Sequence, residues 1–174
     1  MNINSRFKKS DIGIGNKTMI HKDFNCDIYF IRHGESESNA TPGLAAGVNF
    51  DAPLTKLGHQ QAKSLGERFK NEKVVFDNVF CSTLTRAIQT TENIFIGMDN
   101  PKRKFTKVPE IIEQQIPGWR GVPTEEAYTN DTMSYIMEKG NDFVGPDGES
   151  IREVQKRATN WLEDELIYNR KLCS

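Results

Sequence analysis

The sequence IYFIRHGESESNA, residues 28–40, begins with four apolar residues and turns polar at Arg32 and His33. A short apolar run between polar segments is typical of a strand buried on both faces of a parallel sheet, and we predict one over Asp27–Arg32. Binding sites in open parallel sheets form just beyond the carboxyl ends of the strands. Arg32 and His33 would stand at such an end, and Gly34 would let the backbone approach a ligand closely.

Composition and charge exclude several classes of protein. The 174 residues suffice for one domain with a sizeable core. A formal net charge of -1 gives no electrostatic reason to expect nucleic acid or an anionic membrane as a partner. No apolar run is long enough to span a membrane, and the N-terminus lacks the apolar core of a secretion signal. The cysteines Cys26, Cys81 and Cys173 lack metal-ligand spacing, so we expect reduced thiols and a cytoplasmic location.

Strand signals alternate with helix signals along most of the chain. This alternation predicts an α/β fold with a parallel sheet. Residues 1–24 are polar and without period, and we predict an arm or tail there, followed by one domain over 25–174. The other predicted elements are strands over Asp77–Cys81 and Phe105–Val108, and helices from an N-cap at Thr55, over Thr83–Phe95, around Glu125–Met137, and from a capping box at Ser150 and Glu153.

A second arginine follows the second predicted strand. After VFCS (79–82) the chain reads Thr-Leu-Thr and then Arg86, at the start of a helix. Arg86 would therefore point into the same crevice as Arg32 and His33. Two guanidinium groups suit a dianion such as phosphate, and a helix beginning at Ser36 would add free N–H groups. The alternative is an ordinary ion pair at Arg32 and an exposed first-turn Arg86, with no ligand.

Four stretches in this order resemble the histidine phosphatase superfamily, also called phosphoglycerate mutase-like. Together they cover most of residues 27–166, and the first and third are highly specific. The resemblance implies a three-layer α/β sandwich with a mostly parallel central sheet, and a phosphohistidine reaction that needs no metal and no cofactor. The stretches are FIRHGESESN (30–39), APLTKLGHQQAKSLGERF (52–69), FDNVFCSTLTRAIQTTENI (76–94) and GPDGESIREVQKRATNWL (145–162).

The resemblance also implies roles for individual residues. His33, in the Arg-His-Gly-Glu motif, matches the nucleophile that takes the phosphoryl group. Its attacking nitrogen must then be neutral, with the other nitrogen held by a carbonyl. Arg32 and Arg86 match two phosphate-clamping arginines, and Asn39 matches a polar phosphate contact. Cations fixed on the protein neutralise the transferring group, so the implied partner is a phosphorylated substrate or phosphate ion.

The general acid of the family is a carboxylic acid that follows the third strand and precedes a Gly-Trp-type turn. It protonates the leaving oxygen and then activates water. In VPEIIEQQIPGWRGV (108–122), spacing back from Trp119 and Gly121 selects Glu113. Glu110 stays open as the alternative because the turn allows a one-residue shift. For either residue, a solvated loop carboxylate is the interpretation without chemistry.

The second histidine of the family has no match here. It lies late in the family's chains, after a strand that neighbours the nucleophile strand, usually as Ser-His-Gly. His21 falls in the polar lead-in, and we expect His59 on the outward side of its helix. A missing charge-stabilising donor costs about 2.7–4 kcal/mol, or on the order of 100- to 1000-fold in rate. Without that strand, backbone groups and apolar surface would be exposed.

These considerations leave several hypotheses open. A chain ending at Ser174 would be unstable alone, would borrow a strand from residues 1–24 or from the second subunit of a homodimer, or would be a truncated form of a longer protein. The favoured function is a phosphomonoesterase impaired by the missing histidine. A phospho-ligand-binding module without turnover is second. A phosphoglycerate mutase is third, because the loop at 43–50 has little to hold a second acidic group. We expect the loops over residues 114–148 to select the substrate.

Overall fold

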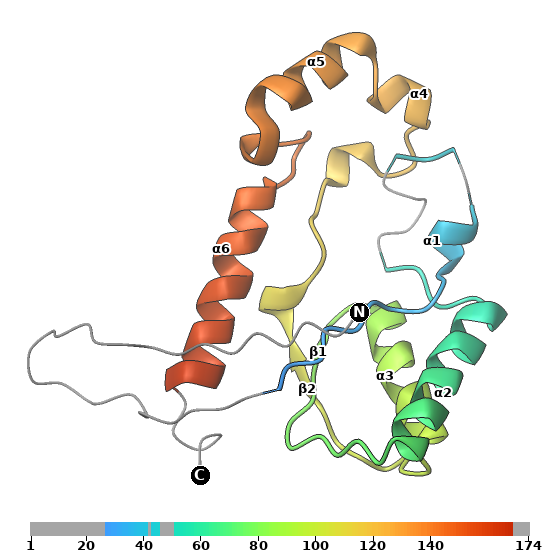
Figure 1. The fold of residues 1–174 in the computed structure, drawn as a ribbon. Helices are drawn as coiled ribbons and strands as arrows, with labels where there is room; N and C mark the ends of the chain where they lie inside the picture. The colour runs from blue at the N-terminus through green and yellow to red at the C-terminus, as the bar shows by residue number, and fades with distance from the viewer. Residues whose placement is uncertain (1–26, 42, 46–50, 169–174) are drawn as a thin grey trace, which may run out of the picture.

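The structure is a computed structural model of the chain, and it describes residues 27–41, 43–45 and 51–168. The polar arm predicted over 1–24 lies outside the described residues. Within the described part, α2 (Lys56–Asn71) and α3 (Thr85–Gly97) lie on one side of a short parallel sheet, and α6 (Ile151–Leu162) lies on the other (Figure 1). The predicted α/β fold class, with a parallel sheet between helical layers, is confirmed.

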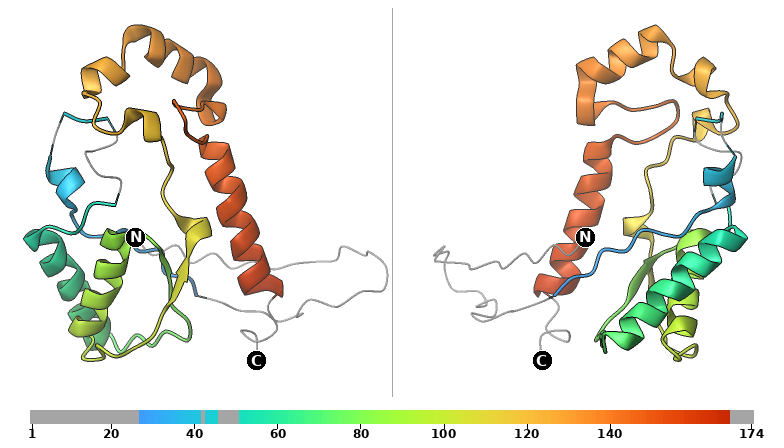
Figure 2. Two further views of the ribbon diagram at one scale, coloured as in Figure 1. Left: turned by 180° about the vertical axis from the view of Figure 1, so that it is seen from behind. Right: turned by 45° about the vertical axis from the view of Figure 1, so that its right-hand side comes forward.

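The sheet consists of β1 (Phe80–Ser82) and β2 (Thr106–Val108), which pair in parallel. Parallel neighbours need a crossover connection, and α3 supplies it. The views in Figure 2 show the same separation of α6 from the α2 and α3 pair. The shorter elements are α1 (Glu37–Ala40), α4 (Thr124–Ala127), α5 (Asn130–Lys139), the 3-10 turns η1 (Pro109–Ile111), η2 (Pro117–Trp119) and η3 (Gly140–Asp142), and the π-helical end η4 (Glu163–Tyr168).

Helices α2 and α3 pack with their backbones in close approach. A Cβ atom built at Gly66 would lie 2.0 Å from the carbonyl oxygen of Ile94, and one at Gly97 would lie 2.2 Å from that of Lys63. Glycine is therefore required at both positions. The core formed by this contact contains Phe95, which is 2% exposed, and Val79 and Phe105, which precede β1 and β2, pack against it. Its buried members are Ala62, Phe69, Ile94 and Phe95.

An aromatic cluster lies under the helices that cap one end of the molecule. Trp119 is buried, and its ring centroid lies 4.8 Å from that of Tyr128 and 5.7 Å from that of Phe143. Tyr135 meets Phe143 edge-on. The single helix predicted around Glu125–Met137 is instead two helices, α4 and α5. The division occurs because the Thr129 side chain accepts a hydrogen bond from the Thr132 N–H and so begins a new helix.

Helix α6 begins at the predicted capping box. The Ser150 hydroxyl accepts a hydrogen bond from the Glu153 N–H at 3.1 Å, and the Glu153 carboxylate accepts one from the Ser150 N–H at 2.7 Å. One residue earlier, Glu149 forms an ion pair with Arg157 on the next turns of the helix, at 2.7 Å. The start of α6 is thus fixed by side chains from both sides of Ser150.

The predicted buried strand over Asp27–Arg32 is wrong. The segment is extended, but it pairs with no strand of the described chain, and the side chain of Phe30 is 75% exposed. A strand needs a hydrogen-bonded neighbour, and in the described sheet β1 pairs with β2 alone. Tyr29 holds the segment on the helical layer instead, through edge-on contacts with Phe69 and Phe76.

Alanine substitutions at two phenylalanines should distinguish the stability contribution of the buried core from that of this exposed segment. Phe95→Ala should lower the free energy of unfolding by about 3–5 kcal/mol, because it leaves a cavity in the core. Phe30→Ala should change it by less than about 0.5 kcal/mol. Urea denaturation of both variants measures the difference. Equal losses would mean that Phe30 is buried in solution.

The Glu149–Arg157 pair should also give stability a pH dependence. The Arg157 guanidinium hydrogen-bonded to Glu149 lowers the pKa of that carboxyl below its ordinary value of 4.5. A lowered folded-state pKa stabilises the fold above the ordinary value, and this contribution disappears as the pH falls through the folded-state value. From about pH 7 to about pH 3, the free energy of unfolding should therefore fall more for the wild type than for Glu149→Gln. Identical pH profiles from urea denaturation would contradict this.

Candidate active site

His33 lies at the end of the extended segment, with both ring nitrogens engaged. Its Nδ1 is 2.7 Å from the carbonyl oxygen of Gly34, and its Nε2 is 3.3 Å from Nε of Arg86. A carbonyl only accepts hydrogen bonds and a guanidinium only donates them. The proton therefore belongs on Nδ1, and Nε2 presents its lone pair. The half-buried imidazole is thus neutral at the nitrogen that faces Arg86.

Arg86 is placed by the first turn of α3. Its side chain is 7% exposed and forms an ion pair with the Glu113 carboxylate, besides its hydrogen bond to His33. The turn is fixed by Asp51, which accepts hydrogen bonds from the backbone N–H and the hydroxyl of Thr85 at 2.5 and 2.8 Å. A buried cation beside a neutral imidazole and a carboxylate is therefore the centre of the site.

Thr90 connects the His33 loop to α3. Its hydroxyl donates to the carbonyl oxygen of Arg86 at 2.7 Å and accepts from the Gly34 N–H at 3.1 Å. Gly34 was predicted to allow close approach of a ligand, and the structure shows protein backbone there. A Cβ atom at Gly34 would lie 2.5 Å from the Gly58 carbonyl oxygen at the start of α2. The loop is therefore in contact with both α2 and α3.

Of the two carboxylates that the sequence left open, Glu113 is the one in contact with Arg86. Glu113 also lines the large cavity that contains His33, and Glu110 is not among the residues lining it. Glu110 lies in the exposed turn η1, and its carbonyl oxygen accepts a hydrogen bond from Arg157. The structure thus brings Glu113, His33 and Arg86 together.

Arg32 and Asn39 line the same cavity. Arg32 is exposed and makes no hydrogen bond or ion pair with another residue of the described chain. The side-chain oxygen of Asn39 accepts hydrogen bonds from the N–H and the hydroxyl of Ser36, at 3.1 and 2.9 Å, which closes the capping box of α1. An amide oxygen only accepts, so the Asn39 amide nitrogen is the atom that could donate a hydrogen bond to a ligand.

The cavity measures about 1610 Å³ and extends well beyond the cluster around His33. Trp119 and Tyr128 border it, so these rings both pack against each other and face the open space. Its lining includes apolar side chains from the unpaired segment, β1 and α6. Its apolar members include Ile28, Phe30, Phe80, Ala158, Trp161 and Leu162.

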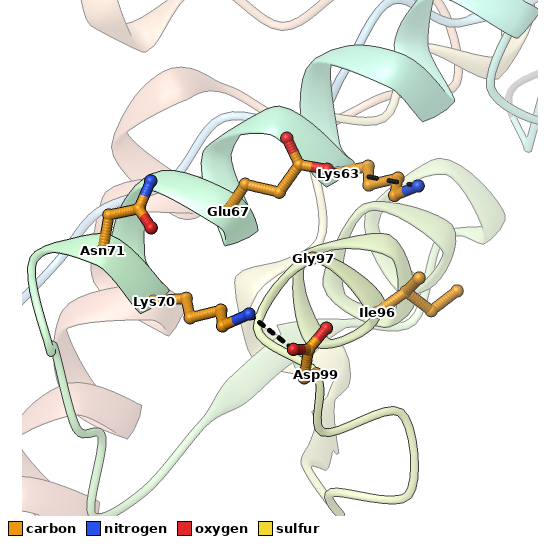
Figure 3. Close-up of a pocket in the computed structure, with 7 residues that line it drawn as sticks. All are labelled: Lys63, Glu67, Lys70, Asn71, Ile96, Gly97 and Asp99. Carbon is orange, nitrogen blue, oxygen red and sulfur yellow. Dashed lines mark hydrogen bonds and ion pairs between the residues drawn. The ribbon is translucent and has the colours of Figure 1, made fainter.

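A smaller hollow of about 510 Å³ lies between α2 and α3 (Figure 3). Figure 3 shows Lys70 pointing to Asp99, and the two side chains are 2.5 Å apart. Lys63 pairs with Glu67 at 4.0 Å. Each of these charges has a partner within the rim, so the hollow presents no free charge cluster for a ligand.

Among the described residues, His59 and Cys81 are not part of the cluster around His33. His59 was predicted to face outward, but it is half-buried, and its Nδ1 lies 2.9 Å from the Asn93 amide nitrogen of α3. His21 lies outside the described residues. Cys81 is buried, and burial raises the pKa of its thiol. Among the described residues there is no group of three His, Cys, Asp or Glu side chains that could hold a metal ion, and no helix long and apolar enough to cross a membrane.

Comparison with known proteins identifies the family. Residues 28–170 match the sequence profile of the histidine phosphatase superfamily, branch 1. The chain belongs to this superfamily. It is 31% identical to a fructose-2,6-bisphosphatase, TIGAR B of Danio rerio, over 82% of this chain and 53% of that protein. It is 29% identical to a 2,3-bisphosphoglycerate-dependent phosphoglycerate mutase of Nitrobacter winogradskyi, over 80% of this chain and 68% of that protein.

Solved structures agree with this membership. The alpha-ribazole phosphatase of Shigella flexneri superposes with a TM-score of 0.64 at 26% identity, over 79% of this chain and 66% of that one. A mycobacterial glucosyl-3-phosphoglycerate phosphatase gives a TM-score of 0.61 at 19% identity, over 79% and 65% of the two chains, and so supports the fold alone. The chain spans about half the length of the fish relative.

Sequence reasoning did not identify Thr90, Asp51, Glu149 or Arg157 as residues that shape the site. Thr90 occupies an ordinary helical position, and its two hydrogen bonds join segments 56 residues apart. Asp51 lies in a loop with no regular pattern. Only the three-dimensional contacts reveal these residues, because each acts on a segment distant in sequence.

Removing the Thr90 hydroxyl should loosen the loop that carries His33. Thr90→Val leaves the buried Gly34 N–H without its acceptor, which should cost about 1–3 kcal/mol of unfolding free energy. Thr90→Ser keeps the hydroxyl and should cost less. Thr91→Val is the matched control, since the Thr91 hydroxyl bonds to the carbonyl of Ala87 and to the Cys81 side chain, and not to the loop that carries His33. If Thr90→Val and Thr91→Val were equally stable in urea, the link to Gly34 would contribute nothing.

Proposed function

We propose that this histidine phosphatase hydrolyses a phosphomonoester through a phosphohistidine on Nε2 of His33. The observation that carries the proposal is the placement of the two ring nitrogens, since Nδ1 faces the Gly34 carbonyl and Nε2 faces a cation. The Nε2 lone pair attacks phosphorus, and the bond from phosphorus to the ester oxygen breaks. Glu113 donates its proton to the leaving oxygen. Water then attacks phosphorus, Glu113 takes a proton from it, and the bond to His33 breaks to release phosphate.

The Arg86–Glu113 ion pair must open for this cycle to run, and the Arg86–His33 hydrogen bond must break so that the Nε2 lone pair can attack. A substrate dianion competes with the carboxylate for the guanidinium, because phosphate offers the same bidentate acceptor geometry with more charge. Once Arg86 has turned to the phosphate, Glu113 stands beside a dianion without its cation. Its carboxyl is then free to exchange a proton with the leaving oxygen. Substrate binding would therefore prepare the general acid.

Arg32 and Asn39 complete the proposed phosphate site. Arg32 is exposed on the cavity wall, where a phosphate would give its guanidinium a bidentate partner. The Asn39 amide nitrogen is a donor, which suits the acceptor oxygens of a phosphoryl group. The charge that develops on these oxygens would be stabilised by fixed protein donors.

A phospho-ligand-binding module without turnover is the second candidate. The observation in its favour is that His33 is the one histidine among the described residues that line the cavity. A site without a further donor on the phosphoryl oxygens would bind phosphate and transfer it slowly. Calorimetry distinguishes the candidates, because a module shows saturable phosphate binding that Arg86→Ala removes, with no hydrolysis of any phosphomonoester.

Phosphoryl labelling of the chain tests the proposed function. Incubation with 32P-labelled p-nitrophenyl phosphate and acid-free quenching should give acid-labile label on the wild type and none on His33→Asn. His59→Asn is the matched control and should label normally, because His59 lies away from the cavity. Arg86→Ala should lower the turnover rate on the order of 100- to 1000-fold. Label that persists in His33→Asn, or its absence from the wild type, would overturn the proposal.

A further inference from the structure

Arg157 of α6 lies behind the segment that carries Glu113 and is not among the residues lining the cavity. Its Nη1 donates to the carbonyl oxygen of Glu110 at 2.5 Å, and its Nη2 lies 3.3 Å from that of Glu113. The same guanidinium binds both carboxylate oxygens of Glu149, at 3.0 Å from Nε and 2.7 Å from Nη2. Arg157 therefore joins α6 to the backbone of Glu110 and to that of Glu113, the candidate general acid.

Glu149 extends this connection to the next residues of the segment. Its carboxylate accepts from the Gln115 N–H at 3.1 Å, and its own N–H donates to the Gln115 carbonyl at 3.0 Å. The Gln114 amide donates to the Glu149 carbonyl at 2.8 Å. Beyond the turn η1, residues 112–115 belong to no helix or strand. Their backbone groups must find partners outside regular structure, and Glu149 and Arg157 provide several of them.

This ion pair differs from its neighbour on the same helix. The side chains of Arg157 and Glu149 are 23% and 21% exposed, and those of Arg152 and Asp142 are 61% and 57% exposed. Exposed pairs contribute little to stability. Arg157 instead combines a two-point contact to a carboxylate with donation to backbone carbonyls, which the single ammonium of a lysine does not reproduce.

We propose that Arg157, held by Glu149, is the positioning residue for Glu113. The inference rests on the proposed function and adds a requirement to it. The Glu113 side chain is 60% exposed, and its carboxylate is tied to Arg86 in the free chain. When a substrate phosphate binds Arg86, the Arg86–Glu113 ion pair is lost. The place of the carboxyl then depends on its own backbone, which Arg157 holds through the carbonyl oxygens of Glu110 and Glu113.

The structural half of the proposal is tested without any activity. Hydrogen exchange of the wild type, Arg157→Met and Arg152→Met is followed by mass spectrometry of peptides covering 109–116. Arg157→Met should speed exchange in these peptides and leave those of α2 and α3 unchanged. Arg152→Met is the matched control, since Arg152 pairs with Asp142 and not with this segment. Wild-type exchange over 109–116 in Arg157→Met would overturn the proposal.

The catalytic half is tested with two esters that differ in their need for an acid. The nitrophenolate of p-nitrophenyl phosphate leaves without much protonation, and the alkoxide of glycerol 2-phosphate requires it. Arg157→Met should slow the alkyl ester on the order of 100-fold, as expected for a misplaced catalytic group, and affect the aryl ester much less. Arg157→Lys should restore only part of the loss. In a Glu113→Gln background, Arg157→Met should add no further preference between the esters.

The outcomes separate the inference from the function on which it rests. Equal slowing of both esters by Arg157→Met in an active enzyme would show that Arg157 merely stabilises the fold, and would overturn the positioning role. If the wild type hydrolysed neither ester, the proposed function would fail. The exchange experiment would then decide alone whether Arg157 holds the backbone of Glu113. A selective loss on the alkyl ester, together with faster exchange over 109–116, supports the proposal.

Discussion

The hydrogen bond from Arg86 to His33 is the contact on which the rest of the site depends. It joins the first turn of α3 to a segment that has no strand partner in the described sheet. It also fixes the tautomer, because the guanidinium leaves Nε2 no role except that of acceptor. Thr90 and the close approach of Gly34 to Gly58 hold the loop in register with both helices. Helices α2 and α3 therefore position the imidazole through Gly58, Arg86 and Thr90.

In the proposed cycle Arg86 neutralises two partners in turn, first Glu113 and then the substrate. In the free chain the buried guanidinium neutralises Glu113, which avoids an uncompensated charge within the protein. With a phosphoryl group present, the same cation would neutralise the substrate and release the carboxyl for proton transfer. Two separate supports then matter: Asp51 and Thr85 for Arg86, and Glu149 and Arg157 for Glu113.

The sequence predicted the elements whose signals are local. Thr55 caps α2 and Ser150 caps α6, as their spacing indicated. His33 and Arg86, which follow two separate apolar runs, are in contact as predicted. The buried strand over Asp27–Arg32 failed because burial of a strand depends on neighbours that its own residues do not encode. The role of Arg157 could not be predicted for a similar reason. On α6 it is one charged residue among several, and only the fold brings it close to Glu113.

The tautomer of His33 is the most direct test of this account. Long-range proton–nitrogen correlation spectra of 15N-histidine-labelled chain, assigned with His33→Asn, report which ring nitrogen carries the proton at neutral pH. The account predicts a proton on Nδ1 and a bare Nε2 in the wild type. Loss of the Arg86 donor in Arg86→Ala should weaken that preference. A wild-type His33 with its proton on Nε2 would contradict the assignment of Nε2 as the nucleophile.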